Sequence, residues 1–201
     1  MAVIAKYCQT ITINVVDINK KRINAWNSDS LEELPIYEPG LKEIIRNIKN
    51  KNLFFTNEIK KSIAEADIVF ISVNTPTKQK GHGAGYACDL KWVEESARDV
   101  AKYSKGHTIV VEKSTLPVKT AELIKTILEA QYQDEEFVSK NKSFSVLSNP
   151  EFLSEGNAIK DLESPDRVLI GGEDENSINE LSEIYKTWIS SDKIIKTNLW
   201  S

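Results

Sequence analysis

Cysteine, glycine and long apolar runs are scarce in this chain of 201 residues. Its two cysteines cannot build a disulfide framework, so a reducing cytoplasm is the expected compartment. The net charge of -4 argues against a nucleic-acid partner, which would require clustered positive charge. No apolar run reaches the roughly 18–20 residues of a membrane span. The two histidines show no metal-ligand spacing, so no metal site is expected.

Short apolar stretches alternate with amphipathic ones along the chain. Strands are predicted over residues 11–17, 52–55, 66–73, 108–111, 144–147 and 167–170. Helices are predicted over residues 20–26, 41–49, 58–65, 90–103, 118–130 and 177–188. Continuous apolar strands alternating with amphipathic helices indicate a parallel sheet covered on both faces. The predicted class is α/β, a doubly wound, Rossmann-like parallel sheet.

Asp17 closes the first predicted strand and is the first candidate site residue. In dinucleotide-binding folds, an acid at the end of the second strand hydrogen-bonds the adenine ribose hydroxyls. Such an acid favours NAD, because the extra phosphate of NADP would meet a negative charge. Arg22, about one helical turn later, could lie near the adenine. Asp17 could instead simply cap the following helix, and this alternative stays open.

The glycine fingerprint that binds a pyrophosphate is not found ahead of this acid. It should lie roughly 20 residues earlier, and counting back from Asp17 runs off the chain. Residues 2–10 contain no glycine and resemble the tail of the helix that follows such a loop. We therefore expect a sheet that lacks its first strand, in a partial N-terminal NAD-binding domain over residues 1–201.

Polar clusters follow three later strands, at the carboxyl ends where open α/β sheets bind ligands. The first cluster is Val73, Asn74, Thr75, Pro76 and Thr77; the second runs from Glu112 to Pro117 and includes Ser114, Thr115 and Leu116; the third runs from Ser148 to Gly156. Ordinary turns and helix caps also fit the first two clusters. In the third, Glu151 or Glu155 could act as general acid or base, although surface glutamates are usually just solvated.

Several segments, in their order along the chain, closely resemble the animal-type UDP-glucose 6-dehydrogenases. They are VVDINKKRINAWNS, LPIYEPGL, ADIVFISVNTPT, VEKSTLPV, LSNPEFLSEG, AIKDL and PDRVLIGG. The resemblance covers essentially the whole chain, and LPIYEPGL, SVNTPT and SNPEFLSEG are specific in combination. It implies oxidation of UDP-glucose to UDP-glucuronate by two NAD molecules, through a thiohemiacetal and a thioester on a cysteine.

The resemblance also implies a role for each strand-end cluster. Glu151 matches the catalytic glutamate, and Thr115 lies near the reacting centre. The residues that match NAD contacts are Asp17, Arg22, Val73, Asn74, Thr75, Pro76, Thr77, Ser114, Thr115, Leu116 and Glu155. The residues that match sugar-nucleotide contacts are Glu151, Phe152, Leu153, Ser154 and Glu155. The family further implies a homo-oligomer, with UDP-glucose as the partner and neither nucleic acid nor membrane.

The chain departs from this family at both ends. The glycine loop, the catalytic lysine, the central helix, the cysteine nucleophile and the UDP-binding domain have no counterpart in it. Neither Cys8 nor Cys88 has the setting of an activated nucleophile. We therefore expect residues 1–201 alone to bind NAD weakly or not at all, and to make no NADH. Two alternatives are a truncated, non-catalytic paralogue that regulates full-length subunits, and a dehydrogenase of another nucleotide sugar.

Overall fold

The computed structural model describes residues 1–114, 119–130 and 142–198. The chain divides into two compact units. Unit 1 comprises Met1–Ser62, Phe152–Val168 and Leu181–Ile194. Unit 2 comprises Ile63–Glu151, Leu169–Glu180 and Ile195–Ser201. The chain therefore leaves each unit and returns to it, so that segments far apart in sequence share one core.

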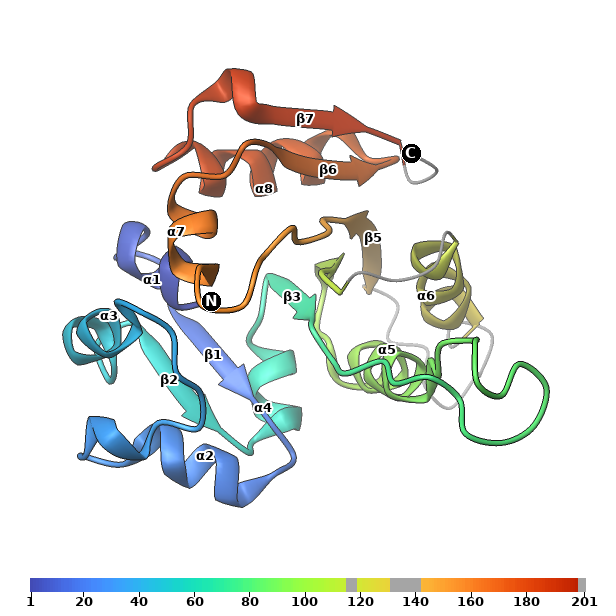
Figure 1. Cartoon of the computed structure of the whole chain (residues 1–201). Coiled ribbons are helices and arrows are strands. Elements are labelled where there is room, and N and C mark those ends of the chain that lie inside the picture. Colours follow the sequence, from blue (N-terminus) through green and yellow to red (C-terminus); the bar gives the residue numbers. More distant parts are fainter. Residues whose placement is uncertain (115–118, 131–141, 199–201) are drawn as a thin grey trace. The chain divides into compact units, whose positions relative to one another are not determined.

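Unit 1 is built on a two-stranded parallel sheet, β1 (Ile13–Val16) and β2 (Leu53–Thr56), shown in Figure 1. Its helical elements are α1 (Ala2–Tyr7), α2 (Lys20–Asn27), η1 (Leu31–Glu33), α3 (Leu41–Ile48), α7 (Ala158–Glu163) and η4 (Ser191–Lys193). The side chains of Leu41, Ile44, Ile45 and Ile48 recur at helical spacing and form the buried face of α3. Helix α2 packs on β2 through Trp26, whose ring stacks on Phe55 with centroids 4.7 Å apart.

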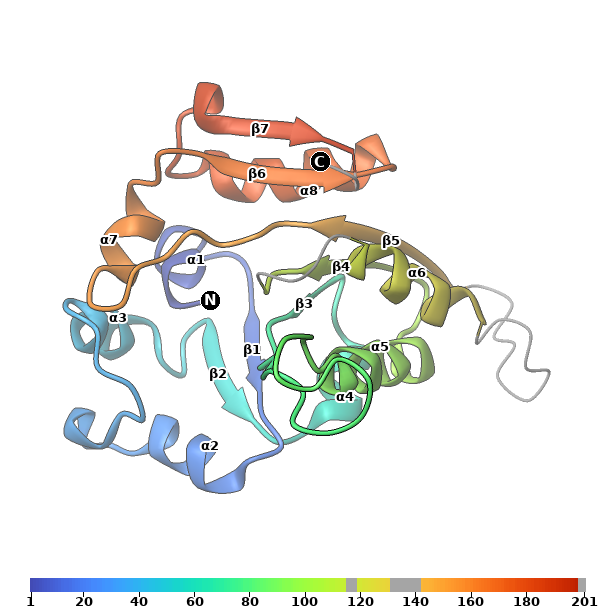
Figure 2. The ribbon, with the colours of Figure 1, turned by 45° about the vertical axis from the view of Figure 1, so that its right-hand side comes forward.

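A five-stranded sheet lies mainly in unit 2, in the order β3-β4-β5-β6-β7. Its strands are β3 (Ile68–Ile71), β4 (His107–Glu112), β5 (Ser143–Ser148), β6 (Val168–Gly172) and β7 (Ile194–Thr197). Strands β3, β4 and β5 are parallel, and Figure 2 shows β4 and β5 side by side. Residues 108–112 of β4 are all buried, as expected of a central strand covered on both faces.

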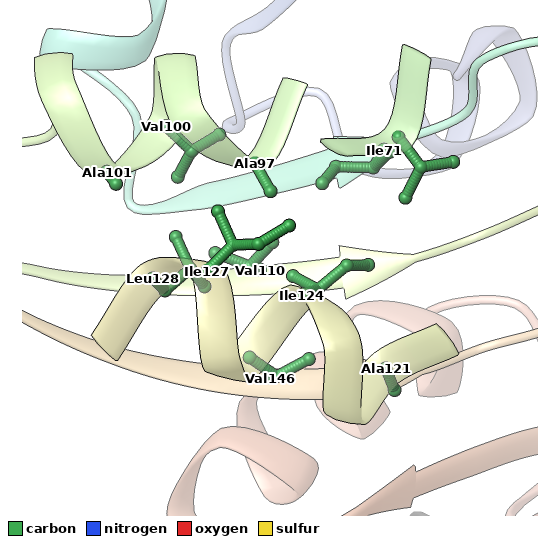
Figure 3. Packing of buried hydrophobic residues seen from close by; sticks show 11 residues of the cluster. Ile71, Ala97, Val100, Ala101, Val110, Ala121, Ile124, Ile127, Leu128 and Val146 are labelled. Carbon is green, nitrogen blue, oxygen red and sulfur yellow. The ribbon is translucent and has the colours of Figure 1, made fainter. Parts of the chain in front are cut away.

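The core of unit 2 forms where α5 (Lys91–Tyr103) and α6 (Thr120–Ala130) pack on this sheet (Figure 3). Ala97 and Val100 come from α5 and Ile124 from α6, and all three are at most 1% exposed. Val110 of β4 joins them. This core includes Ile71 of β3 and Val146 of β5, so it supports the three strands that lead into the loops after β3, β4 and β5.

Two further helices connect the units, α4 (Ile59–Ala64) after β2 and α8 (Glu175–Lys186) after β6. The predicted α/β, Rossmann-like class is confirmed, and each predicted helix and strand is found within a few residues, as far as the described residues reach. Helix α7 and strand β7 were missed. Strand β6 also differs from the prediction of a wholly parallel sheet, because it pairs antiparallel with β5.

Strands β1 and β3 are not paired with each other in the part of the chain that the structure describes. In the doubly wound order 3-2-1-4-5-6, β1 and β2 match strands 2 and 3, and β3, β4 and β5 match strands 4, 5 and 6. Each of β1 and β3 thus has one edge without a described neighbour.

Candidate functional site

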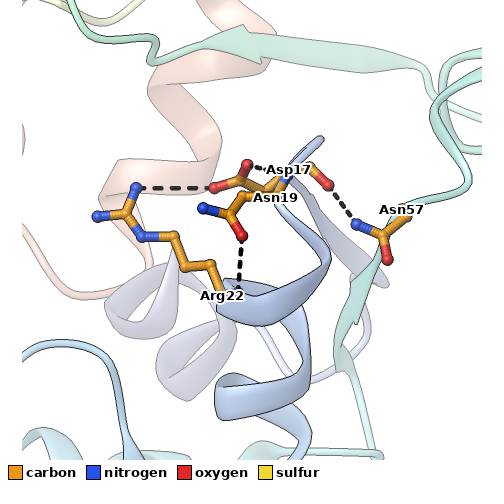
Figure 4. Close-up of polar contacts among 4 residues, drawn as sticks. All are labelled: Asp17, Asn19, Arg22 and Asn57. Carbon is orange, nitrogen blue, oxygen red and sulfur yellow. Dashed lines mark hydrogen bonds and ion pairs between the residues drawn. The ribbon is translucent and has the colours of Figure 1, made fainter.

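Asp17 lies directly after β1, in a network of short polar contacts (Figure 4). Its Oδ1 accepts the backbone N–H of Asn19 at 2.8 Å, and its Oδ2 is 3.7 Å from the Arg22 guanidinium. The Asn57 amide donates to the backbone carbonyl of Asp17 at 2.5 Å. The carboxylate is therefore held at the carboxyl end of the strand, with its side chain still 29% exposed.

Helix α2 is capped by Asn19 rather than by Asp17. The Asn19 Oδ1 accepts the backbone N–H of Arg22 at 3.2 Å, the usual geometry of an N-cap. Asp17 therefore does not serve as the N-cap, and its carboxylate keeps spare acceptor capacity. Sequence reasoning missed Asn19 and Asn57, although an asparagine just before a helical stretch is itself a cap signal.

The loops after β3 and β4 meet through a hydrogen bond from the Ser114 hydroxyl to the carbonyl of Val73, at 3.2 Å. The loop after β3 is closed at its base, because Thr77 bridges Cys88 and Asp89 N–H donates to the Pro76 carbonyl at 2.8 Å. Thr115 and Leu116, expected in the second loop, lie outside the described residues. In the described residues, this hydrogen bond thus brings together the first two predicted polar clusters, those after β3 and β4.

Glu112 and Lys113, at the end of β4, are buried charged residues that belong to the second predicted cluster but were given no role there. They are 5% and 8% exposed. The Lys113 ammonium donates to the backbone carbonyl of Asn149 at 3.2 Å, and the Ser148 hydroxyl donates to Glu112 Oε2 at 3.2 Å. These bonds tie the end of β4 to the end of β5. The sequence signal that could have identified them is a pair of charged residues directly at the end of an apolar strand.

Burial dominates the protonation of both groups. It raises the pKa of Glu112 to about 7, against the opposing effects of the Ser148 hydroxyl and Lys113. It lowers the pKa of Lys113, although the nearby carboxylates of Glu151 and Glu112 favour the charged ammonium. Among the described residues, Glu112 Oε1 is buried without a hydrogen-bond partner. The Glu151 carboxylate thus lies close enough to act on the Lys113 ammonium.

The stretch from Glu151 to Glu155 crosses from one unit to the other, with Glu151 in unit 2 and the rest in unit 1. Both glutamates are exposed, and so is Phe152, whose ring lies 5.0 Å from the Arg167 guanidinium. Ser154 is anchored, because Asp161 Oδ2 accepts its N–H at 3.0 Å and its hydroxyl at 2.7 Å. These two bonds lower the pKa of Asp161, the backbone bond first.

In the described residues, no group of three or more His, Cys, Asp and Glu side chains could hold a metal ion. No described helix is both long and apolar enough to cross a membrane. Both cysteines are free thiols, with Cys8 buried and Cys88 half-buried. Polar loops at the carboxyl ends of parallel strands, with a held acid after β1, define an α/β dinucleotide-binding domain.

Residues 1–189 match the NAD-binding domain of the UDP-glucose/GDP-mannose dehydrogenase family, and the chain belongs to this family. It is 54% identical over 205 residues to UDP-glucose 6-dehydrogenase 5 of Oryza sativa subsp. japonica. It is 55% identical to the UDP-glucose 6-dehydrogenase of Caenorhabditis elegans and 52% identical to that of Gallus gallus. Each match covers 100% of this chain and only 40–41% of the relative, so the chain spans less than half of these proteins.

Solved structures agree with this assignment. A UDP-glucose dehydrogenase from Pyrobaculum islandicum superposes with a TM-score of 0.81 at 28% identity, over 98% of this chain and 43% of that one. A ternary complex of the GDP-mannose dehydrogenase from Pseudomonas aeruginosa gives a TM-score of 0.80 at 27% identity, over 98% and 44%. The predicted family, fold and NAD cofactor are therefore confirmed.

Proposed function

We propose that this chain is the NAD-binding part of an enzyme that oxidises UDP-glucose to UDP-glucuronate. The observation that carries the proposal is its 52–55% identity, over its whole length, to UDP-glucose 6-dehydrogenases of a plant, a bird and a nematode. Identity to the GDP-mannose dehydrogenase structure is 27%. Because a UDP-glucose dehydrogenase structure is equally distant, at 28%, the substrate is inferred from the three relatives at 52–55% identity, all of which are UDP-glucose 6-dehydrogenases.

The residues around Asp17 fit the adenosine side of NAD. The carboxylate has acceptor capacity beyond its bonds to Asn19 and Arg22, which ribose hydroxyls can use. Its negative charge selects against a 2′-phosphate. The half-exposed Arg22 guanidinium can lie over the adenine. When bound, NAD supplies the hydride acceptor.

The later strand ends supply the other proposed contacts. For NAD they are Val73, Asn74, Thr75, Pro76, Thr77, Ser114, Thr115, Leu116 and Glu155. For UDP-glucose they are Glu151, Phe152, Leu153, Ser154 and Glu155. We assign Glu151 as the acid–base residue, with Thr115 beside the reacting centre. Support for Glu151 comes from its place beside the buried Lys113, whose charged form its carboxylate favours.

We also propose a cytoplasmic homo-oligomer. The compartment is supported by the two free thiols, Cys8 and Cys88, since secreted proteins of this size more often pair their cysteines. Oligomerisation is supported by the family resemblance.

The test is a chimera, called here the rice chimera, in which residues 1–201 replace the matching segment of UDP-glucose 6-dehydrogenase 5 from rice. NADH formation is followed with UDP-glucose, UDP-N-acetylmannosamine and GDP-mannose. We expect turnover with UDP-glucose alone, and a loss of about 100-fold or more on Glu151→Gln. The control is Glu122→Gln, an exposed position on α6.

A chimera that folds without oxidising UDP-glucose would refute the proposed activity and favour a non-catalytic role. Turnover of another sugar nucleotide in its place would refute the substrate. An active chimera indifferent to Glu151→Gln would refute the role of Glu151.

A further inference from the structure

The LPIYEPGL segment, residues 34–41, has no part in the contacts proposed above. Its Ile36 and Tyr37 are 47% and 78% exposed, so these two side chains do not build the core. Glu38, between them and Gly40, is partly buried and points elsewhere. Its Oε1 accepts the backbone N–H of Gly156 at 3.1 Å, and its Oε2 accepts that of Ala158 at 3.3 Å.

These two amides lie at the end of the stretch that the proposed function assigns to UDP-glucose. Gly156 follows Glu155 directly and has a φ of +81°, a left-handed conformation that glycine adopts without steric cost. Ala158 begins α7. One carboxylate therefore holds the backbone on both sides of Asn157, and a charged acceptor makes such bonds stronger than neutral ones.

Gly40 lies near the same segment. A Cβ built on Gly40 would lie 3.8 Å from Ile159 Cγ2, which is ordinary van der Waals contact. Gly40 itself has a φ of +83° and is the N-cap of α3. The turn of LPIYEPGL thus lies close to the first turn of α7, the segment whose backbone Glu38 binds.

Ser154 has a local anchor, Asp161, only seven residues away in the sequence. Glu38 lies 118 residues from Gly156. The Asp161 bonds can form as soon as α7 forms, whereas the Glu38 bonds require unit 1 to be assembled. The local anchor fixes the middle of the loop, and the distant one fixes its end relative to the rest of unit 1.

We propose that Glu38 is a positioning residue, which holds the backbone of Gly156 and Ala158 and thereby keeps Glu155 and Phe152–Ser154 in place for the sugar nucleotide. This inference rests on the proposed function, because that assigns the stretch to UDP-glucose. Glu38 does not touch the substrate; it acts through the backbone of Gly156.

The test uses Glu38→Gln and Glu38→Ala in the rice chimera. Glutamine keeps one acceptor oxygen and replaces the other by an amide that cannot accept, so it should lose one of the two bonds. Alanine loses both. The matched control is Glu32→Gln, which removes an exposed ion pair to Lys42 at 2.5 Å in the preceding segment.

Two readouts are needed. Hydrogen exchange should become faster in the peptide covering residues 154–160 with Glu38→Gln, and faster still with Glu38→Ala, while residues 143–148 are unchanged. The KM for UDP-glucose should rise about tenfold with Glu38→Gln, with kcat changed less than threefold, because displaced loop backbone weakens binding. Glu32→Gln should change neither.

Unchanged exchange in residues 154–160 would overturn the proposal, and so would an unchanged KM for UDP-glucose. A fall in kcat and melting temperature with no change in KM would indicate a merely structural role and would also overturn it. If the unsubstituted chimera does not oxidise UDP-glucose, the proposed function fails separately. In that case, hydrogen exchange of residues 154–160 and the calorimetric affinity for UDP-glucose test the positioning role of Glu38.

Discussion

The ammonium group of Lys113 donates a hydrogen bond to the backbone carbonyl of Asn149 over 3.2 Å, and both residues are buried. Asn149 in turn donates its side-chain amide to the Leu169 carbonyl at 2.8 Å. The ends of β4 and β5 and the start of β6 are thereby joined by polar bonds rather than by apolar packing alone. Glu151 follows Asn149 by two residues, so its position depends on this junction.

Replacing Lys113 should destabilise this junction. Lys113→Met removes the buried donor to Asn149 and the positive charge near Glu151 and Glu112, which should lower local stability by about 3 kcal/mol. Native-state hydrogen exchange of β4 and β5 in the rice chimera measures this. Lys105→Met, at an exposed position, is the control. Equal protection of β4 and β5 against hydrogen exchange in both variants would show that the buried hydrogen bond does not contribute to local stability.

Glu112 should make stability depend on pH. Its folded pKa of about 7 lies above the ordinary 4.5, so between these values the folded state binds more protons than the unfolded one. Its contribution is therefore present below pH 4.5 and is lost as the pH rises through 7, by about 3 kcal/mol. Glu112→Gln should match the parent near pH 5 and melt higher than it at pH 8.

The control for this prediction is Glu94→Gln on α5, a partly buried residue whose side chain is 42% exposed. Its melting temperature should follow that of the parent chimera at every pH. If the Glu112→Gln difference is the same at pH 5 and pH 8, Glu112 titrates normally and the prediction is wrong.

Asp17 should govern NAD affinity. Asp17→Asn keeps an acceptor for the Asn19 N–H but loses the charge that strengthens hydrogen bonds to ribose hydroxyls. We expect the Kd for NAD to rise by about 10-fold or more, corresponding to roughly 1.5–3 kcal/mol, and discrimination against NADP to weaken. Calorimetry on the rice chimera measures both. Asp29→Asn, at an exposed position, should leave the affinity unchanged; a matching result for Asp17→Asn would refute its role.

Asn52 should be important for the stability of unit 1. Its buried side-chain amide donates to the carbonyls of Ala5, Cys8 and Ile11, at 2.9, 3.3 and 3.4 Å. Asn52→Ala leaves buried carbonyls without this donor and should cost about 2 kcal/mol. Protection of α1 and β1 against hydrogen exchange should fall. The exposed Asn47→Ala on α3 should have no such effect.

Local sequence patterns were sufficient to predict most of the helices and strands. The apolar run in β4 and the helical spacing of Leu41, Ile44, Ile45 and Ile48 are strong signals, and both elements were predicted. Helix α7 and strand β7 contain no fully buried residue, so neither shows the apolar face or run that marks a core element. The antiparallel pairing of β6 was not predictable either, because pairing direction depends on how the chain returns to the sheet.

The sequence by itself determined the α/β class, the family and the positions of candidate residues at strand ends, because each is encoded in a short stretch. Tertiary structure alone decided which of those residues have partners. Glu38 meets Gly156 across 118 residues, and Lys113 meets Asn149 across 36. Such contacts depend on the packing of whole elements, and burial, which shifts the pKa of Glu112, exists only once that packing has excluded water.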